Sequence, residues 1–273
     1  MTIGMRGHDL SVTTLAQLSA TCGSLQVPTL QLALGKSVPG FRKGLFSPHY
    51  ATQIRNTLAE NKVGVTVLGC YINPSEADPA KLEANLSLFE EALKYAKFLG
   101  ADMVGLETGY PTPETAHTEE AYQTLLTNMR RLVASAEKLG VMIGIEGVHL
   151  FVIDTPEMMR RLLDDLNSPN VCVIFDPCNY LGPHNWEEQD AIMERACRLL
   201  AEEFAVLHIK DFAFRNGEFV YTPPMQNGLH LEKLFSLLAQ YKPNLPVILE
   251  EVNEQTYAPT AAAIEQIARS VTR

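Results

Sequence analysis

Four short apolar runs in the second half of the chain each lead directly to a carboxylate or a histidine. The runs and the residues that follow them are Met142–Ile145 with Glu146, Val171–Phe175 with Asp176, Ala205–Leu207 with His208, and Pro246–Leu249 with Glu250. Such runs are typical of buried parallel strands, whose carboxyl ends meet at one edge of a sheet or barrel. The pattern therefore predicts three carboxylates and one imidazole around a single centre.

Strand-like and helix-like segments alternate along the whole chain. The expected strands are Ile3–Arg6, Leu25–Gln31, Val63–Tyr71, Met103–Leu106, Met142–Ile145, Val171–Phe175, Ala205–Ile209 and Val247–Leu249. The expected helices are Thr13–Cys22, Pro48–Glu60, Ala80–Leu99, Glu119–Leu139, Pro156–Leu166, Glu187–Glu203, Leu231–Leu238 and Thr260–Val271. Eight such units in 273 residues predict one (β/α)8 TIM barrel of the α/β class, spanning residues 1–273 as a single domain.

A doubly wound open sheet is the alternative fold. It is disfavoured because no G-x-G-x-x-G follows the first strand and no P-loop pattern occurs. The longest stretches expected to be irregular are Leu32–Phe46, Glu107–His117 and Asp211–Gly228. All three follow strands, so they should stand over the face of the barrel where substrates bind.

Composition narrows the classes of partner. The net charge of −10 disfavours nucleic acid and anionic membranes, and no apolar stretch is long enough to span a bilayer. The first ten residues lack the apolar core of a signal peptide, and the five cysteines form no C-x-x-C pair. We therefore expect a cytoplasmic protein with reduced thiols that binds a small molecule.

The predicted centre has the donor set of a divalent metal site. Carboxylate oxygens and an imidazole nitrogen suit Mn, Co, Zn or Mg, and one ion would leave open positions for substrate oxygens. A single acid at a strand end is more often a helix cap or an ion-pair partner, so the prediction rests on all four residues together. Glu251 is an alternative to Glu250 as the fourth ligand. The two are neighbours, so their side chains point to opposite sides of a strand, and the sequence does not show which one points inward.

Four segments resemble the sugar phosphate isomerase/epimerase superfamily, the xylose isomerase-like barrels. They are Gly144-Ile-Glu146, Ile174-Phe-Asp176-Pro-Cys-Asn179, Val206-Leu-His208-Ile-Lys210-Asp211 and Val247-Ile-Leu-Glu250-Glu251. The resemblance implies that Glu146, Asp176, His208 and Glu250 bind one divalent metal. It also implies that Glu146 and Glu250 transfer protons through a metal-bound enediolate.

These implications leave several functions open. The first is a sugar, polyol or keto-acid isomerase or epimerase, and the second is a dehydratase (lyase) of a keto-polyol such as inosose or dehydroshikimate. A sugar-binding barrel without activity is disfavoured because all four expected ligands are present. Asn179 stands where epimerases and endonuclease IV of this superfamily usually carry a histidine, and further histidines needed for DNA repair are missing.

Further residues are candidates for substrate binding. They are His8, His149, Asn179, His184, Lys210 and Arg215. Each has an ordinary alternative: His149 as a loop residue, Lys210 as an ion-pair partner of a rim carboxylate. Few cationic residues gather on the loops, which favours an unphosphorylated substrate. A homo-oligomer is possible for a barrel of this kind.

Overall fold

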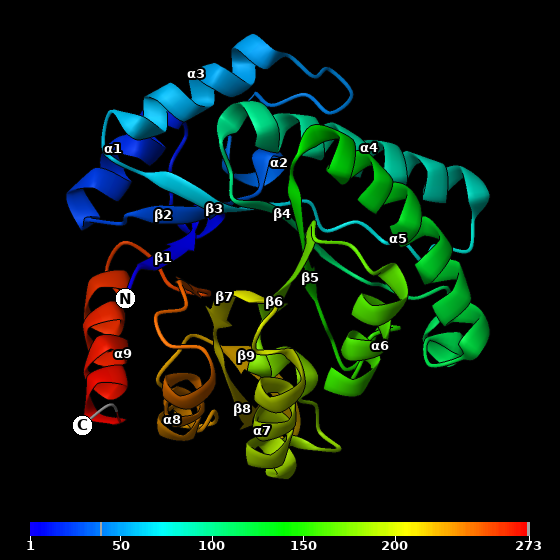
Figure 1. Ribbon diagram of the computed structural model, residues 1–273. Coiled ribbons are helices and arrows are strands. Elements are labelled where there is room, and N and C mark those ends of the chain that lie inside the picture. Colours follow the sequence, from blue (N-terminus) through cyan, green and yellow to red (C-terminus); the bar gives the residue numbers. More distant parts are fainter. Residues whose placement is uncertain (39, 272–273) are drawn as a thin grey trace.

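The computed structural model describes residues 1–38 and 40–271, and within them eight parallel strands close into a barrel (Figure 1). Their order around the barrel is β1-β10-β7-β6-β5-β4-β3-β2. The bounds are β1 (Ile3–Arg6), β2 (Thr29–Leu32), β3 (Gly64–Gly69), β4 (Met103–Glu107), β5 (Met142–Glu146), β6 (Val171–Phe175), β7 (Phe204–Ile209) and β10 (Val247–Leu249). The predicted (β/α)8 barrel is confirmed, and a doubly wound open sheet is excluded.

Helices connect the strands and pack around the barrel (Figure 1). They are α1 (Leu15–Leu25), α2 (Leu34–Ser37), α3 (Pro48–Ala59), α4 (Pro79–Leu99), α5 (Glu119–Leu139), α6 (Pro156–Leu166), α7 (Gln189–Leu200), α8 (Leu231–Tyr241) and α9 (Tyr257–Val271). Residues at the ends of the helices determine where several of them begin and end. The Asp78 side chain accepts the backbone N–H groups of Ala80 and Lys81, and Gly100 ends α4 in the left-handed conformation.

The strands divide the core into two parts. Side chains that point inward fill the barrel, and they belong to Val67, Met103, Cys172, Ile174, Val206 and Ile248. Alternate side chains point outward and join the larger apolar core under the helices. The barrel interior is therefore packed, and the carboxyl ends of the strands remain to build a site.

Gly4 in β1 is where the barrel tolerates a side chain least. A Cβ there would lie 2.2 Å from the carbonyl oxygen of Thr29, whereas a Cβ at Gly64 in β3 would find no atom closer than 3.7 Å. We expect Gly4→Ala to lower the free energy of unfolding by about 2 kcal/mol or more, because the clash involves backbone. Urea denaturation measures this. A loss no larger than that of the control Gly64→Ala would contradict the packing described here.

The structure corrects the sequence prediction at three places. Residues Leu32–Phe46, expected to be irregular, contain the short helix α2. Residues Asp211–Gly228, expected to be irregular, contain the antiparallel hairpin of β8 (Asp211–Arg215) and β9 (Glu218–Thr222). Its turn is Asn216-Gly217, both at positive φ, which is a common hairpin sequence. The strand expected to begin at Leu25 begins at Thr29, because α1 continues to Leu25 and Gln26 caps it with φ of 57°.

None of the helices in residues 1–38 and 40–271 has the length and apolar character that crossing a membrane requires.

Candidate metal centre

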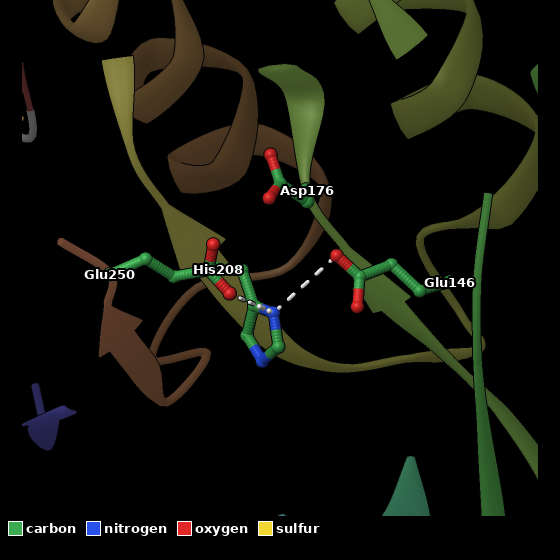
Figure 2. Close-up of side chains that lie close together, drawn as sticks. All are labelled: Glu146, Asp176, His208 and Glu250. Atoms are coloured by element: carbon green, nitrogen blue, oxygen red, sulfur yellow. Dashed lines mark ion pairs between the residues drawn. The ribbon is translucent and has the colours of Figure 1, made fainter. Parts of the chain in front are cut away.

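Four side chains from adjacent parts of the barrel converge at the carboxyl ends of the strands (Figure 2). Glu146 is the last residue of β5, Asp176 follows β6, His208 lies in β7 and Glu250 follows β10. These strands are consecutive in the barrel order β10-β7-β6-β5. One ligand atom from each residue lies within 4.8 Å of the others. The structure thus brings the four residues together.

The cluster is almost completely withdrawn from solvent. Exposed fractions are 2% for Glu146, 1% for Asp176, 0% for His208 and 7% for Glu250. The Nδ1 atom of His208 lies 3.5 Å from Glu146 Oε1 and 3.3 Å from Glu250 Oε1. Buried carboxylates this close to one another need positive charge nearby.

Lys210 supplies part of that charge. Its buried ammonium group pairs with Asp176 and lies 3.2 Å from Glu250 Oε2. Burial raises the pKa of Asp176 to about 6, even though Lys210 acts in the opposite direction. Burial also favours the neutral form of Glu250, but Lys210 and His208 outweigh it and hold its pKa well below the ordinary value.

The donor set fits a divalent cation. With a neutral His208, three carboxylates and Lys210 leave two negative charges, which one divalent ion would balance. In the part of the chain that the structure describes, Nε2 of the buried His208 ring has no hydrogen-bond partner, while Nδ1 faces the carboxylates of Glu146 and Glu250. An imidazole buried among three carboxylates is the arrangement expected of a metal ligand set.

A chain of hydrogen bonds orients Glu146. Asn179 donates its side-chain amide to Glu146 Oε1 at 2.6 Å. The Tyr71 hydroxyl donates to Glu146 Oε2 at 3.3 Å and accepts from the side-chain amide of Gln31 at 2.8 Å. Asn179 therefore holds a carboxylate of the cluster in place, which explains how asparagine can serve at this position.

The structure decides between Glu250 and Glu251. Glu250 lies in the cluster, whereas the Glu251 side chain is 49% exposed and pairs with Arg6 at 2.8 Å. The backbone of Glu251 has φ of 59°, so the chain turns sharply after Glu250, and the Glu251 side chain lines the cavity without joining the cluster. Arg6 also lies 3.5 Å from Glu250 Oε2 and so links the two glutamates.

A cavity of about 550 Å³ opens onto the cluster. Glu146 and Glu250 line it, and Asp176 and His208 are not among the described residues of its wall. Of the candidate substrate residues, His8, Asn179 and Lys210 also line it. Burial, followed by Arg6 and Lys36, lowers the pKa of His8 to about 4, so this ring is neutral at pH 7.

The other three candidates lie away from this wall. His149 and His184 pack against each other with ring centroids 5.5 Å apart, and His184 is exposed. Arg215 is exposed at the end of β8, next to the hairpin turn. Their contacts with substrate stay predictions from the sequence.

His149 should make stability depend on pH. Burial, and then the positive potential of His184 and His117, lowers its pKa from 6.5 to about 4. Between these two values the unfolded chain binds a proton that the folded protein excludes, so stability falls as the pH drops through this range. We expect His149→Gln to remove about 1 kcal/mol of this pH dependence, a reduced figure because solvent screens a half-buried ring.

Urea denaturation at pH 7 and pH 4.5 measures the effect, with the exposed His49→Gln as control. Equal pH dependence in the wild-type protein and in His149→Gln would contradict the prediction.

The polar residues at the ends of β1, β2 and β4 were not predicted as part of the site. Arg6 ends β1, Gln31 lies near the end of β2 and Glu107 ends β4, and all three line the cavity. The rule that found Glu146 would have found them, had it been applied to every strand. Burial, followed by the neighbouring Glu146, raises the pKa of Glu107 to about 8.

The chain resembles known proteins over nearly its whole length. Residues 27–272 match the family model of the xylose isomerase-like TIM barrel. No curated protein sequence matches the chain significantly.

Several solved structures share the fold. D-psicose 3-epimerase from Clostridium cellulolyticum H10, solved with D-tagatose, is 16% identical with a TM-score of 0.74, covering 100% of both chains. The IOLI protein with a bound zinc atom is 17% identical with a TM-score of 0.74, covering 100% of this chain and 96% of that one. The apo form of 3-keto-D-glucoside 4-epimerase from E. coli is 14% identical with a TM-score of 0.74, covering 97% of this chain and 99% of that one.

The family match covers most of the chain, and the structural matches show the same barrel at low sequence identity. The chain therefore belongs to the xylose isomerase-like TIM barrel family.

Proposed function

We propose that residues 1–273 act as one barrel domain, a metal-dependent isomerase or epimerase of a small sugar or polyol. One observation carries the proposal: of the four clustered residues, the two glutamates line the cavity, whereas Asp176 and His208 are not among the described residues of its wall. Two carboxylates that reach one substrate can act as a base and an acid. The similar structures described above include D-psicose 3-epimerase and 3-keto-D-glucoside 4-epimerase, and these support the choice.

Glu146, Asp176, His208 and Glu250 would hold one divalent metal, Mn, Co, Zn or Mg. Bound there, the metal would supply Lewis acidity beside a substrate carbonyl and so make the neighbouring C–H group acidic. The zinc atom bound to the IOLI protein, which has the same fold, supports the expectation of a bound metal. Lys210 already stabilises negative charge at Asp176 and Glu250.

The proton transfers belong to the two glutamates. Glu250 is ionised at neutral pH, so it can remove a proton from the substrate carbon. Glu146, oriented by Asn179 and Tyr71, can take a proton from solvent and deliver it to the same carbon from the other face or to the neighbouring carbon, while Glu250 releases the proton that it removed. The first outcome is epimerisation and the second is isomerisation. His8 and Lys210 line the same cavity and would bind substrate oxygens.

Glu107 favours a second candidate, a dehydratase (lyase). With a pKa of about 8 its carboxyl group carries a proton at neutral pH, and it lines the same cavity. A protonated acid near the substrate could assist the departure of a β-hydroxyl as water. Release of water, accompanied by a new conjugated carbonyl absorbance, would identify this reaction.

Metal content and proton exchange test the proposal together. The protein is purified without chelator, its metal per chain is measured, and ketoses and keto-polyols are incubated with it in D₂O containing Mn²⁺ or Zn²⁺. We expect about one metal per chain and deuterium incorporation next to the carbonyl of at least one compound. A protein that binds no metal after reconstitution would overturn the proposal. The cytoplasmic location and the oligomeric state stay predictions.

A further inference from the structure

Part of the cavity wall is not used by the proposed chemistry. It is formed by apolar residues of α2, α4 and the loops after α2 and β3, and we call it the apolar annex: Leu34, Phe41, Ile72, Leu88, Ala92 and Tyr95. Figure 1 shows α2 and α4, which carry most of these residues, beside β2–β4 and across the barrel from α7 and α8. The whole cavity, about 550 Å³, falls in the range of roughly 300–1,000 Å³ that holds drug-sized ligands.

One stripe of α4 forms a wall of the annex. Leu88, Ala92 and Tyr95 are spaced four and three residues apart, so they lie on one side of the helix. Phe89 and Leu93, on a neighbouring stripe, are fully buried, and Ala92 and Tyr95 are also buried in the same core, with 7% and 1% of their surface exposed, whereas Leu88 is partly exposed. The core packing of α4 therefore fixes the direction of the stripe that faces the cavity.

Aromatic side chains shape the annex. The rings of Phe41 and Tyr95 meet edge to face with centroids 5.4 Å apart. Tyr95 borders the cavity but is 1% exposed, and its hydroxyl is engaged by the carbonyl oxygen of Leu45, to which it donates. An aromatic ring placed beside these two would gain the same edge-to-face contacts.

The annex provides few hydrogen-bond partners for a hydroxyl group of a ligand. Lys36 and Lys43 also line the cavity, but both are exposed, so their ammonium groups reach solvent. Glu91 already accepts the backbone N–H of Gly44. A sugar hydroxyl buried against Leu34 and Ala92 would lose its hydrogen bonds to water without replacement.

The polar part of the cavity wall and the apolar annex thus select different chemistry. The polar part presents Glu146, Glu250, Lys210 and Asn179, and Tyr71 lines the cavity while its hydroxyl is bonded to Glu146. We propose that the ligand is a sugar carrying an aromatic substituent, with the sugar at the polar part and the ring in the apolar annex. The sugar half of this inference rests on the proposed function.

Two uncharged glucosides that differ only in the substituent test it. Binding of phenyl β-D-glucopyranoside and methyl β-D-glucopyranoside to the full chain is measured by calorimetry, with and without Mn²⁺. We expect the phenyl compound to bind about 10- to 100-fold more tightly, as burial of an aromatic ring implies. Equal affinities, or no binding of either compound, would overturn the inference.

Variants locate the ring. Ala92→Phe fills the annex and Leu88→Ala removes part of its wall, so both should reduce the phenyl-to-methyl affinity ratio, the first to about one. Ala84→Phe adds the same bulk to an exposed position of α4 and should keep the wild-type ratio. Melting curves show which variants are folded.

A folded Leu88→Ala and a folded Ala92→Phe that both keep the full ratio would place the ring elsewhere and overturn the inference. Measuring the two affinities does not require catalysis. A protein that exchanges no deuterium would contradict the proposed function, and its phenyl-to-methyl affinity ratio would still test the position of the ring.

Discussion

Glu250→Gln should lower the rate of deuterium exchange into the substrate by about 10²- to 10⁴-fold, the usual contribution of a general base. The side chain faces the cavity, lies in the cluster and is ionised at neutral pH, because Lys210 and His208 offset its burial. Glutamine keeps the size of the side chain but accepts no proton. The rate is measured on whichever compound exchanges fastest with the wild-type protein.

Glu251→Gln is the matched comparison. Its carboxylate pairs with Arg6 and is about half exposed, so we expect less than a tenfold loss of rate. Metal content measured on both variants separates loss of proton transfer from loss of metal. A Glu250→Gln variant with wild-type metal content and wild-type exchange would show that the base lies elsewhere.

The barrel and the position of its site were readable from the sequence because strand ends obey a simple rule. Parallel strands buried by helices are apolar throughout, so the first charged residue after each run marks the carboxyl end. That rule placed Glu146, Asp176 and His208 around one centre, and the structure brings them together.

The sequence alone does not show which of Glu250 and Glu251 joins the cluster, and the three-dimensional structure was needed to distinguish them. The two residues are adjacent and chemically identical, and the positive φ of Glu251 that separates them has no sequence signature of its own. Orientation by Tyr71 and Gln31 was also out of reach, since that contact joins the end of β2 to the loop after β3 and then to β5.

The apolar annex shows another limit. Leu88, Ala92 and Tyr95 read as an ordinary core stripe of an amphipathic helix, and periodicity alone does not separate a side chain that fills the core from one that borders a cavity. The difference depends on how α2 and Phe41 lie against α4.

His208→Ala should weaken binding of Zn²⁺ or Mn²⁺ by at least about 100-fold, more than the loss of a residue that only orients a ligand. The ring is fully buried, its Nδ1 faces the carboxylates of Glu146 and Glu250, and its Nε2 has no hydrogen-bond partner among the described residues. Alanine leaves three carboxylates and Lys210 without the nitrogen donor. Metal titration followed by calorimetry measures the affinity.

Thermal stability gives an independent readout of the same change. A ligand present at about 100 times its dissociation constant stabilises the folded state by roughly 2.7 kcal/mol, so metal should raise the melting temperature of the wild-type protein and of the exposed His49→Ala control. It should raise that of His208→Ala much less. Equal stabilisation of all three proteins would mean that the metal binds without this histidine. The four side chains would then be a structural charge cluster held by Lys210, and the proton chemistry assigned to its glutamates would lose its basis.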